Sequence, residues 1–308
     1  MRPHLIEAAA DTSIEACAAE LRAVLADRNS LAEAPRLFRG FALGEPGDLS
    51  SLLKLIDVLA APYIGGNSPR TQLGENVYTS TEYSALSDIT QHQELSYELR
   101  TPDVLFFLCA RPSDTGGATP LTHAAAVLHK LDPELVAEFQ ARGLRYVQRL
   151  PAAGGVGKSW PEAFETSDRA ACERLLAGLD VTYTWDDGDT LVLVRDRPAL
   201  RRHSRTGTQL WFNQADQWHP SSLGSARKRE ALQRMYGDRL PHDVVFGDGT
   251  PISDDAIAEI SKVTRATAWA APWQASDLVV IDNQATMHGR DRYTGARSVF
   301  VAMATLGD

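Results

Sequence analysis

The segment Asp103–Ala110 (DVLFFLCA) limits the fold more than any other, because it is apolar on both faces. A strand without a polar face must be covered on both sides, so it belongs inside a packed core. Its longest apolar run, Val104–Ala110, is far shorter than the roughly 20 residues of a membrane-spanning helix. The segment therefore predicts a buried strand.

Short β-type segments and helical patterns alternate along the rest of the chain. We expect strands at 34–41, 76–83, 144–150, 181–185, 190–194, 209–213, 278–281 and 297–305. We expect helices near 14–25, 49–59, 123–142, 167–179, 225–236 and 253–268, the third broken at Asp132-Pro133. Gly65, Gly66, Asn67 and Pro69 predict a polar loop. These patterns favour an α+β chain with a mainly β core and helices outside it.

Charge and cysteine content exclude several function classes. Lys and Arg number 31 against 40 Asp and Glu, a net charge of −9, which argues against a nucleic-acid partner. No signal peptide is readable, since Glu7, Asp11 and Glu15 follow Arg2 too closely. The three cysteines are widely spaced, without a CxxC motif, and are expected to be reduced packing residues. We expect a cytoplasmic protein with no membrane association.

His92-Gln93-Glu94 is the first candidate for chemistry. It is the only place where a histidine is followed two residues later by a carboxylate. Two such ligands and one distant histidine form the 2-His-1-carboxylate triad of non-haem iron sites. Taken alone, however, the pair is more often an exposed polar pair, because the composition predicts one by chance.

Two further elements could complete a site. His288 follows an apolar segment in DLVVIDNQATMHGR, on an expected short loop, and Arg297 begins the last apolar segment. A buried Arg needs an anionic partner, which could be a dicarboxylate ligand or an internal salt bridge. In Gly116–Pro120 (GGATP) the glycines allow close backbone approach and Thr119 offers a hydroxyl to an oxyanion, although a plain turn fits equally well.

Together, the ordered motifs resemble the TauD/TfdA superfamily of Fe(II)- and 2-oxoglutarate-dependent oxygenases. The likeness runs from about Phe38 to the end of the chain, and is nearest to the branch typified by the syringomycin-pathway aspartyl hydroxylase. The motifs are NVYTSTEY, HQELSY, PDVLFFLCARP, GGATPL, WFNQ and DLVVIDN…HGR…R.

The resemblance implies one oxygenase domain over residues 1–308, with a double-stranded β-helix (a cupin-like jelly roll) and the metal at its open mouth. It makes His92, Glu94 and His288 the Fe(II) ligands. Arg297 would bind the distal carboxylate of 2-oxoglutarate, with Thr119 as a hydrogen-bonding helper. Many members carry another Arg further along the last strand, where this chain has Val301 and Ala302. Arg290 or a backbone amide is therefore expected at the keto-acid end.

The implied reaction uses O2, converts 2-oxoglutarate into succinate and CO2, and hydroxylates an unactivated C–H bond. The expected substrate is an amino acid or derivative, free or tethered to a peptidyl carrier protein, in specialised metabolism. The basic stretch Arg201–Gly207 (RRHSRTG) could contact an acidic substrate or a carrier arm, but a solvated loop is favoured. Residues that could line the substrate pocket are Asn76, Ser80, Trp211 and Asn213, although Trp211 fits the core equally well.

Other outcomes remain open from the sequence. The same cofactors could serve desaturation, epoxidation, cyclisation, or oxidation of a small sulfonate or carboxylate. Halogenation is disfavoured, because it would need a small residue in place of Glu94. A zinc hydrolase and a metal-free binding scaffold are the alternatives from other classes. A homo-oligomer is compatible with the sequence.

Overall fold

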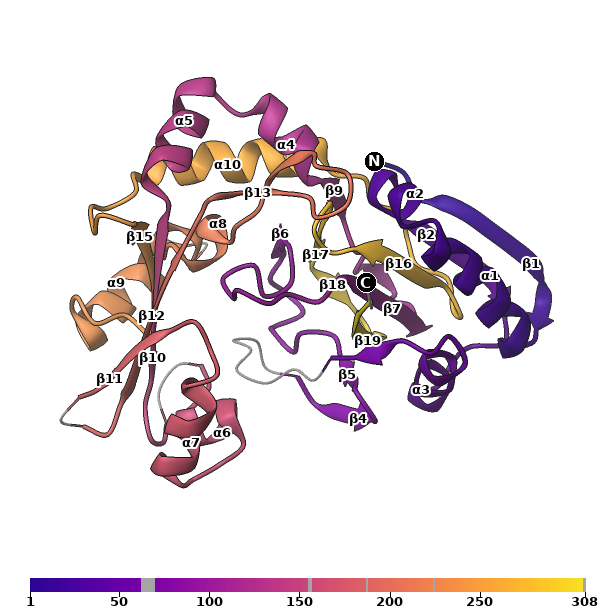
Figure 1. Ribbon diagram of the computed structural model, residues 1–308, viewed down its shortest axis with the longest axis horizontal. Helices are drawn as coiled ribbons and strands as arrows, with labels where there is room; N and C mark the ends of the chain where they lie inside the picture. Colours follow the sequence, from indigo (N-terminus) through magenta and orange to yellow (C-terminus); the bar gives the residue numbers. More distant parts are fainter. Residues whose placement is uncertain (62–69, 155–156, 187, 224, 307–308) are drawn as a thin grey trace.

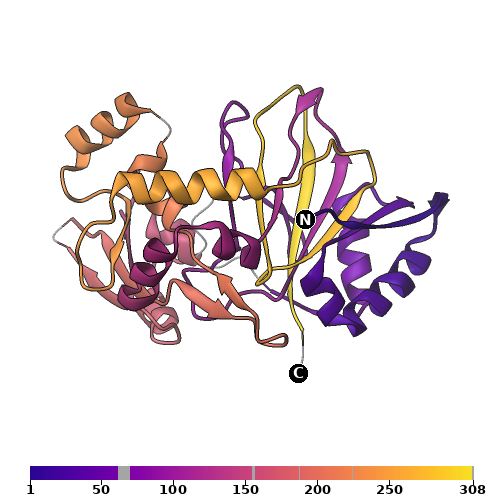
Figure 2. The same ribbon diagram turned by 90° about the horizontal axis from the view of Figure 1, so that it is seen from above.

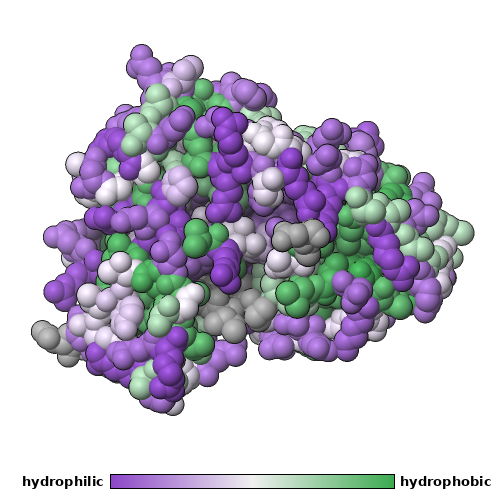
Figure 3. All heavy atoms as spheres, in the orientation of Figure 1, coloured by the Kyte–Doolittle hydropathy of each residue, from purple (hydrophilic) through white to green (hydrophobic). Residues whose placement is uncertain are grey.

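Two β-rich halves lie side by side in the computed structural model, with helices around them (Figure 1). One half is built around an eight-stranded sheet and the other around a four-stranded sheet. The structure describes residues 1–61, 70–154, 157–186, 188–223 and 225–306. The polar loop expected around Gly65, Gly66, Asn67 and Pro69 lies outside these ranges. Hydrophilic side chains cover most of the face in Figure 3, with apolar patches between them. None of the helices in the described ranges combines the length and apolar character needed to cross a bilayer.

The larger sheet has eight strands and holds the buried segment near its middle. In spatial order the strands are β1 (His4–Thr12), β2 (Arg36–Phe41), β16 (Leu278–Asp282), β7 (Val104–Arg111), β19 (Ser298–Thr305), β5 (Val77–Thr79) and β4 (Gln72–Gly74), with β3 (Leu59–Ala60) also paired to β19. Because β7 lies between β16 and β19, its backbone groups are paired on both sides. This confirms the interior strand that the sequence predicts.

The alternation of side chains along β7 explains why both of its faces are apolar. Leu105, Phe107 and Cys109 point into one hydrophobic cluster. Phe106 and Leu108 point into another, where they pack with α1 and α3 residues. Helices therefore cover one face of the sheet, and the other face looks towards the smaller sheets.

Four smaller sheets complete the β structure. A three-stranded sheet comprises β6 (Ile89–His92), β17 (Thr286–Arg290) and β9 (Leu121–His123). A four-stranded sheet comprises β11 (Thr182–Trp185), β12 (Leu191–Arg197), β10 (Leu144–Leu150) and β15 (His242–Phe246). The remaining pairs are β8 (Thr115–Gly116) with β18 (Tyr293–Thr294), and β13 (Leu200–Arg202) with β14 (Gln209–Trp211).

The helices surround these sheets. Those beside the larger sheet are α1 (Ile14–Ala26), α2 (Arg28–Glu33) and α3 (Pro46–Leu55). The others are α4 (Ala124–Lys130), α5 (Pro133–Arg142), α6 (Trp160–Phe164), α7 (Arg169–Leu176), α8 (Ala215–Trp218), the 3-10 turn η1 (Pro220–Leu223), α9 (Ala226–Tyr236) and α10 (Asp254–Thr267). The long α10 crosses between the halves in Figure 2 and contacts α4, α8, β6 and β9.

Local sequence signals account for the helix ends. The Ser13 hydroxyl accepts a hydrogen bond from the Ala16 amide at the start of α1, and Ser253 caps α10 in the same way. The expected break at Asp132-Pro133 is confirmed, because Asp132 caps α5 and Pro133 opens it.

Some expected boundaries are wrong. The helix expected at 49–59 begins at Pro46 and ends at Leu55, because the following chain pairs with β19 as β3. Only Val77–Thr79 of the segment 76–83 is a strand. His288 lies on strand β17 and not on a loop. The N-terminal strand β1 was not expected, since its residues show little alternation and its parallel pairing with β2 is a tertiary contact.

The three cysteines are buried and form no disulfide, as expected. Burial raises the pKa of Cys17 and of Cys109 to about 12, so both thiols are unreactive packing groups at neutral pH.

Gly289 allows β6 and β17 to approach closely, and we expect Gly289→Ala to separate them. An added Cβ would lie 2.5 Å from the Ile89 carbonyl oxygen, a backbone atom that cannot rotate away. Overpacking of this kind costs about 1–3 kcal/mol, and chemical denaturation would measure it. Gly44→Ala is the control, because a Cβ there meets nothing within 4 Å. Equal stability of the two variants would contradict this assignment.

Candidate metal centre

His92, Glu94 and His288 converge on one buried point. His92 ends β6 and pairs directly with His288 on the antiparallel strand β17. Glu94 lies two residues beyond the end of β6. Ligand atoms of the three side chains all lie within 4.8 Å of one another, and the two imidazole centroids are 4.6 Å apart. The structure thus brings together the three residues that the sequence singled out.

The charge states of this cluster suit a divalent metal. Nδ1 of His92 lies 2.8 Å from the Thr90 carbonyl oxygen, which can only accept, so Nε2 is left with a lone pair for a metal. Burial, helped by the charge of His288, lowers the pKa of His92 to about 4 and keeps the ring neutral. Burial alone would raise the pKa of Glu94, but Arg70 and the hydrogen bond from His288 hold it well below its usual range.

Two imidazoles and one ionised carboxylate are the donor set of the non-haem Fe(II) facial triad. The same set would also accept Zn(II). The nearest counter-charge is Arg70, whose guanidinium nitrogen lies 2.7 Å from Oε2 of Glu94. The residues present therefore fit an iron ion held by His92, Glu94 and His288.

Asn283 fixes the backbone of Glu94. Its Oδ1 accepts from the Glu94 amide at 2.8 Å, and its Nδ2 donates to the Glu94 carbonyl at 3.0 Å and to the Pro102 carbonyl at 2.9 Å. Gln93, between the two ligands, points away from the cluster and donates to the Trp211 carbonyl. The ligand segment is thus held by buried amide side chains, which is how outer partners orient metal ligands.

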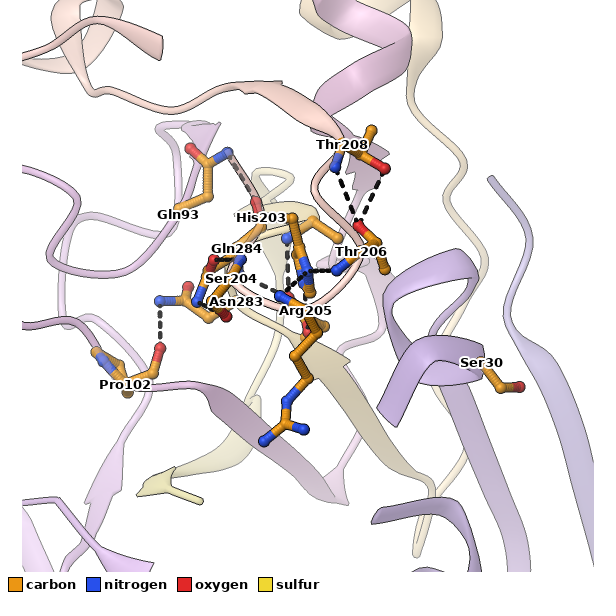
Figure 4. Close-up of polar contacts among 12 residues, drawn as sticks. Ser30, Gln93, Pro102, His203, Ser204, Arg205, Thr206, Thr208, Asn283 and Gln284 are labelled. Atoms are coloured by element: carbon orange, nitrogen blue, oxygen red, sulfur yellow. Dashed lines mark hydrogen bonds and ion pairs between the residues drawn. The ribbon is translucent and has the colours of Figure 1, made fainter. Parts of the chain in front are cut away.

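A second network of polar side chains lies next to Asn283, around His203 and Gln284 (Figure 4). Nδ1 of His203 accepts from the Arg205 and Thr206 amides, so its Nε2 carries the proton and faces Asp282 at 3.0 Å. Gln284 exchanges hydrogen bonds with Ser204. The expected solvated loop at 201–207 is confirmed only in part, because residues 204–207 are exposed whereas Arg201 and Arg202 lie on strand β13 and His203 is buried.

A small pocket lies on one side of the cluster. It is lined by Arg297, Thr119 and Ser80 together with His92 and His288. Arg297 donates to the Gly117 carbonyl at 2.9 Å and to the Ser80 hydroxyl at 3.2 Å. Burial, followed by the charge of Arg290, lowers the pKa of Arg297 to about 10, so an anion beside it would be stabilised.

The glycine pair before Thr119 permits this arrangement. Gly117 has φ +69°, and a Cβ there would lie 2.3 Å from the Ser113 hydroxyl and 3.1 Å from Cδ of Arg297. Thr119 is buried and accepts a hydrogen bond from Nε1 of Trp273 at 3.2 Å.

Arg290 is engaged elsewhere. Its two terminal nitrogens donate to four backbone carbonyls, those of Thr81, Tyr83, Ser84 and Ser87. Arg290 also lines the small pocket. Because its terminal nitrogens are used by these carbonyls, the geometry favours a role in holding the loop between β5 and β6 and not a contact with the keto-acid end of a cosubstrate.

A pocket of about 870 Å³ opens on the other side of the cluster. His92 and Glu94 form part of its wall. Its wall also includes Arg70, Tyr97, Lys158, Gln214, Gln217 and Trp218. Arg70 also lines the small pocket, so it stands at the boundary between the two.

The expected substrate residues are mostly placed elsewhere. Asn76 occupies the β4–β5 turn with φ 57°, a conformation that Asn tolerates, and it lines neither pocket. Trp211 is fully buried in the core. Asn213 bonds the Ala199 carbonyl and the Ala215 amide. Of the WFNQ motif only Gln214 reaches the large pocket, and Ser80 belongs to the small one.

Arg70, Lys158 and Gln217 line the large pocket but carry no signal in the sequence that points to it. Arg70 and Lys158 lie in irregular segments without a local motif. Asn283 was visible as part of DLVVIDN, but its contact with Glu94 joins positions 189 residues apart.

Removal of the Asn283 amide should weaken metal binding more than it weakens the fold. We expect Asn283→Ala to lower Fe(II) affinity by about 10–100-fold, as is typical for outer partners of metal ligands. Anaerobic metal titration would measure it. Asn213→Ala is the matched control, because that buried amide also makes two backbone hydrogen bonds but touches no ligand. An affinity loss of the same size in both variants would contradict the positioning role.

Comparisons with known proteins agree with this geometry. The family described as "Taurine catabolism dioxygenase TauD, TfdA family" matches residues 11–303. The dapdiamide synthesis protein DdaC of Enterobacter agglomerans is 32% identical over 267 residues, covering 87% of this chain and 80% of that protein. A clavaminate synthase-like protein of Arabidopsis thaliana is 27% identical with the same coverage.

Solved structures show the same fold at low sequence identity. PvcB, an Fe, α-ketoglutarate-dependent oxygenase from an isonitrile synthetic pathway, matches with TM-score 0.53 and 15% identity over 98% of this chain and 85% of its own. An asparagine oxygenase matches with TM-score 0.56 and 15% identity, covering 93% and 79%. With the family match and the His92–Glu94–His288 cluster, these findings identify the chain as an Fe(II)- and 2-oxoglutarate-dependent dioxygenase of the TauD/TfdA family.

Proposed function

We propose that this enzyme hydroxylates an unactivated C–H bond of an amino acid or amino-acid derivative in specialised metabolism. The observation that carries the proposal is the position of the triad between two different pockets. The small pocket has a volume of only about 30 Å³ but supplies the Arg297 guanidinium for a carboxylate of the cosubstrate, whereas the larger one, of about 870 Å³, has room for an organic substrate.

The roles of the side chains follow from their positions. His92, Glu94 and His288 would hold the iron. Arg297 would bind the distal carboxylate of 2-oxoglutarate through its planar guanidinium, with Thr119 hydrogen-bonding beside it. When bound, iron and 2-oxoglutarate supply the oxidising chemistry, with O2 consumed and succinate and CO2 formed.

The topology of the fold, the branch of the family and the form of the substrate are also proposals. We infer a double-stranded β-helix formed by the larger sheet and the three-stranded sheet, within one domain over residues 1–308. We favour the branch typified by the syringomycin-pathway aspartyl hydroxylase, supported by the relatives named for dapdiamide synthesis and an isonitrile pathway. The substrate is free or carried by a peptidyl carrier protein, and the expected compartment is the cytoplasm.

Anaerobic titration with Fe(II) and then 2-oxoglutarate tests the cofactor assignment. We expect wild-type protein to develop the weak visible charge-transfer band of the chelate, and His288→Ala to lose it, because a ligand is removed. His129→Ala is the control, since that exposed histidine lies on α4. If folded, metal-loaded wild-type protein gave no band, the oxygenase assignment would be wrong.

Arg297→Ala tests the cosubstrate assignment. We expect 2-oxoglutarate to bind roughly 30-fold or more weakly, because truncating one partner of a buried charge pair costs about 2–5 kcal/mol. The same charge-transfer band measures the affinity. Arg111→Ala, which removes an exposed guanidinium on the neighbouring strand β7, should change little. Unchanged affinity in the Arg297 variant would refute this role.

A further inference from the structure

The peptide group between Gln93 and Glu94 is hydrogen-bonded from both halves of the molecule. Its N–H, on Glu94, donates to Oδ1 of Asn283 at 2.8 Å. Its carbonyl, on Gln93, accepts from Nε2 of Gln214 at 2.6 Å. Because a peptide group is planar, fixing its two polar ends fixes its plane. The orientation of this plane helps to set the direction in which the Glu94 side chain leaves the backbone.

The turn that follows Glu94 needs such partners. Leu95 has φ 57°, in the left-handed region, which is unfavourable for a residue with a Cβ atom. The Ser96 amide is a second and longer donor to the Gln93 carbonyl, at 3.4 Å. A backbone of this kind persists where the surrounding structure holds it in place. The hydrogen bonds from Asn283 and Gln214 supply that hold on the ligand segment.

Gln214 is kept in one orientation by its partners. Its side chain is buried, and its Oε1 accepts from Nε1 of Trp218 at 3.2 Å. A carbonyl can only accept and an indole N–H can only donate, so a flipped amide would lose both hydrogen bonds. The backbone N–H of Gln214 donates to the Tyr146 hydroxyl at 2.9 Å. The side chain is therefore a fixed link between the Gln93 carbonyl and the Trp218 indole.

The Trp218 end of this link belongs to the large pocket. Trp218 lines that pocket, as do two of the metal ligands. Its ring packs against three other rings, those of Tyr97, Tyr146 and His242, with centroids 4.8, 5.2 and 5.1 Å away. A molecule that fills the pocket meets this ring. A shift of the indole would reach the Gln93 carbonyl through a single side chain.

We propose that Gln214 is a positioning residue that links the wall of the large pocket to the iron ligand Glu94. It holds the carbonyl of the Glu94 peptide from the half that supplies Trp218, whereas Asn283 holds the N–H from the other half. A substrate that packs against the indole acts on the ligand geometry through this amide. That step rests on the proposed function, since it takes the large pocket as the substrate side.

Co(II) reports the geometry of the ligands without cosubstrate or turnover, because its visible bands depend on the coordination geometry. Gln214→Met keeps the length of the side chain and removes both of its hydrogen bonds. We expect it to weaken Co(II) binding by about 10-fold or more and to change these bands. Asn213→Ala is the control, because that buried amide bonds the Ala199 and Ala215 backbone and touches no part of the ligand segment.

Trp218→Phe tests the pocket end of the link. It keeps an aromatic ring in the wall and removes the N–H that donates to Gln214. We expect the Co(II) bands to shift in the same direction as in Gln214→Met, with no further shift when the two changes are combined in a double-mutant cycle. Trp185→Phe is the control and should leave the bands unchanged, since its N–H donates to Glu173 and neither residue lines the pocket.

The outcomes separate the two proposals. If folded Gln214→Met keeps the Co(II) affinity and bands of wild type, the positioning role is wrong. If Trp218→Phe leaves the bands unchanged, or shifts them equally with and without Gln214, the link to the pocket is wrong. Should Gln214→Met not fold, an unchanged spectrum in Trp218→Phe overturns the proposal by itself. If wild-type protein gives no charge-transfer band with Fe(II) and 2-oxoglutarate, the proposed function fails, whereas the Co(II) spectra still decide the role of Gln214.

Discussion

The pairing of β6 with β17 is the interaction on which the site depends. It sets His92 directly opposite His288 and leaves Glu94 just beyond the end of β6, so two segments from distant parts of the chain supply all three ligands. The absence of a side chain at Gly289 lets these strands approach. A shift in register would turn a histidine to the other face and destroy the cluster.

Burying a carboxylate beside two histidines requires compensation. Arg70 supplies the opposite charge at 2.7 Å from Glu94, and Asn283 supplies backbone hydrogen bonds, so the segment keeps its shape. The amide side chains around it contribute orientation, and the arginine contributes charge. Together, the charge of Arg70 and the hydrogen bonds of Asn283 keep the Glu94 carboxylate ionised and directed at the metal position.

The two sides of the metal centre differ in the origin of their residues. The small pocket, which we propose for the cosubstrate, is lined by residues next to the larger sheet and by β6 and β17 of the three-stranded sheet. The large pocket, which we propose for the substrate, is lined by both halves, with Arg70 and Tyr78 from one and Gln214 and Gln217 from the other.

The sequence alone predicts the buried strand β7 and most helices, because these follow from local periodicity and capping residues. The roles of His92, Glu94, His288 and Arg297 follow only from the resemblance to the TauD/TfdA superfamily, since a single His-x-Glu pair is expected by chance in a chain of this composition. The sequence misplaced Asn76, Trp211 and Asn213, since an amide or a ring on a strand fits a pocket and a core equally well. Only the tertiary structure brought Arg70 to Glu94 and Asn283 to the Glu94 backbone. Such contacts depend on packing between distant segments, which leaves no periodic signal in either one.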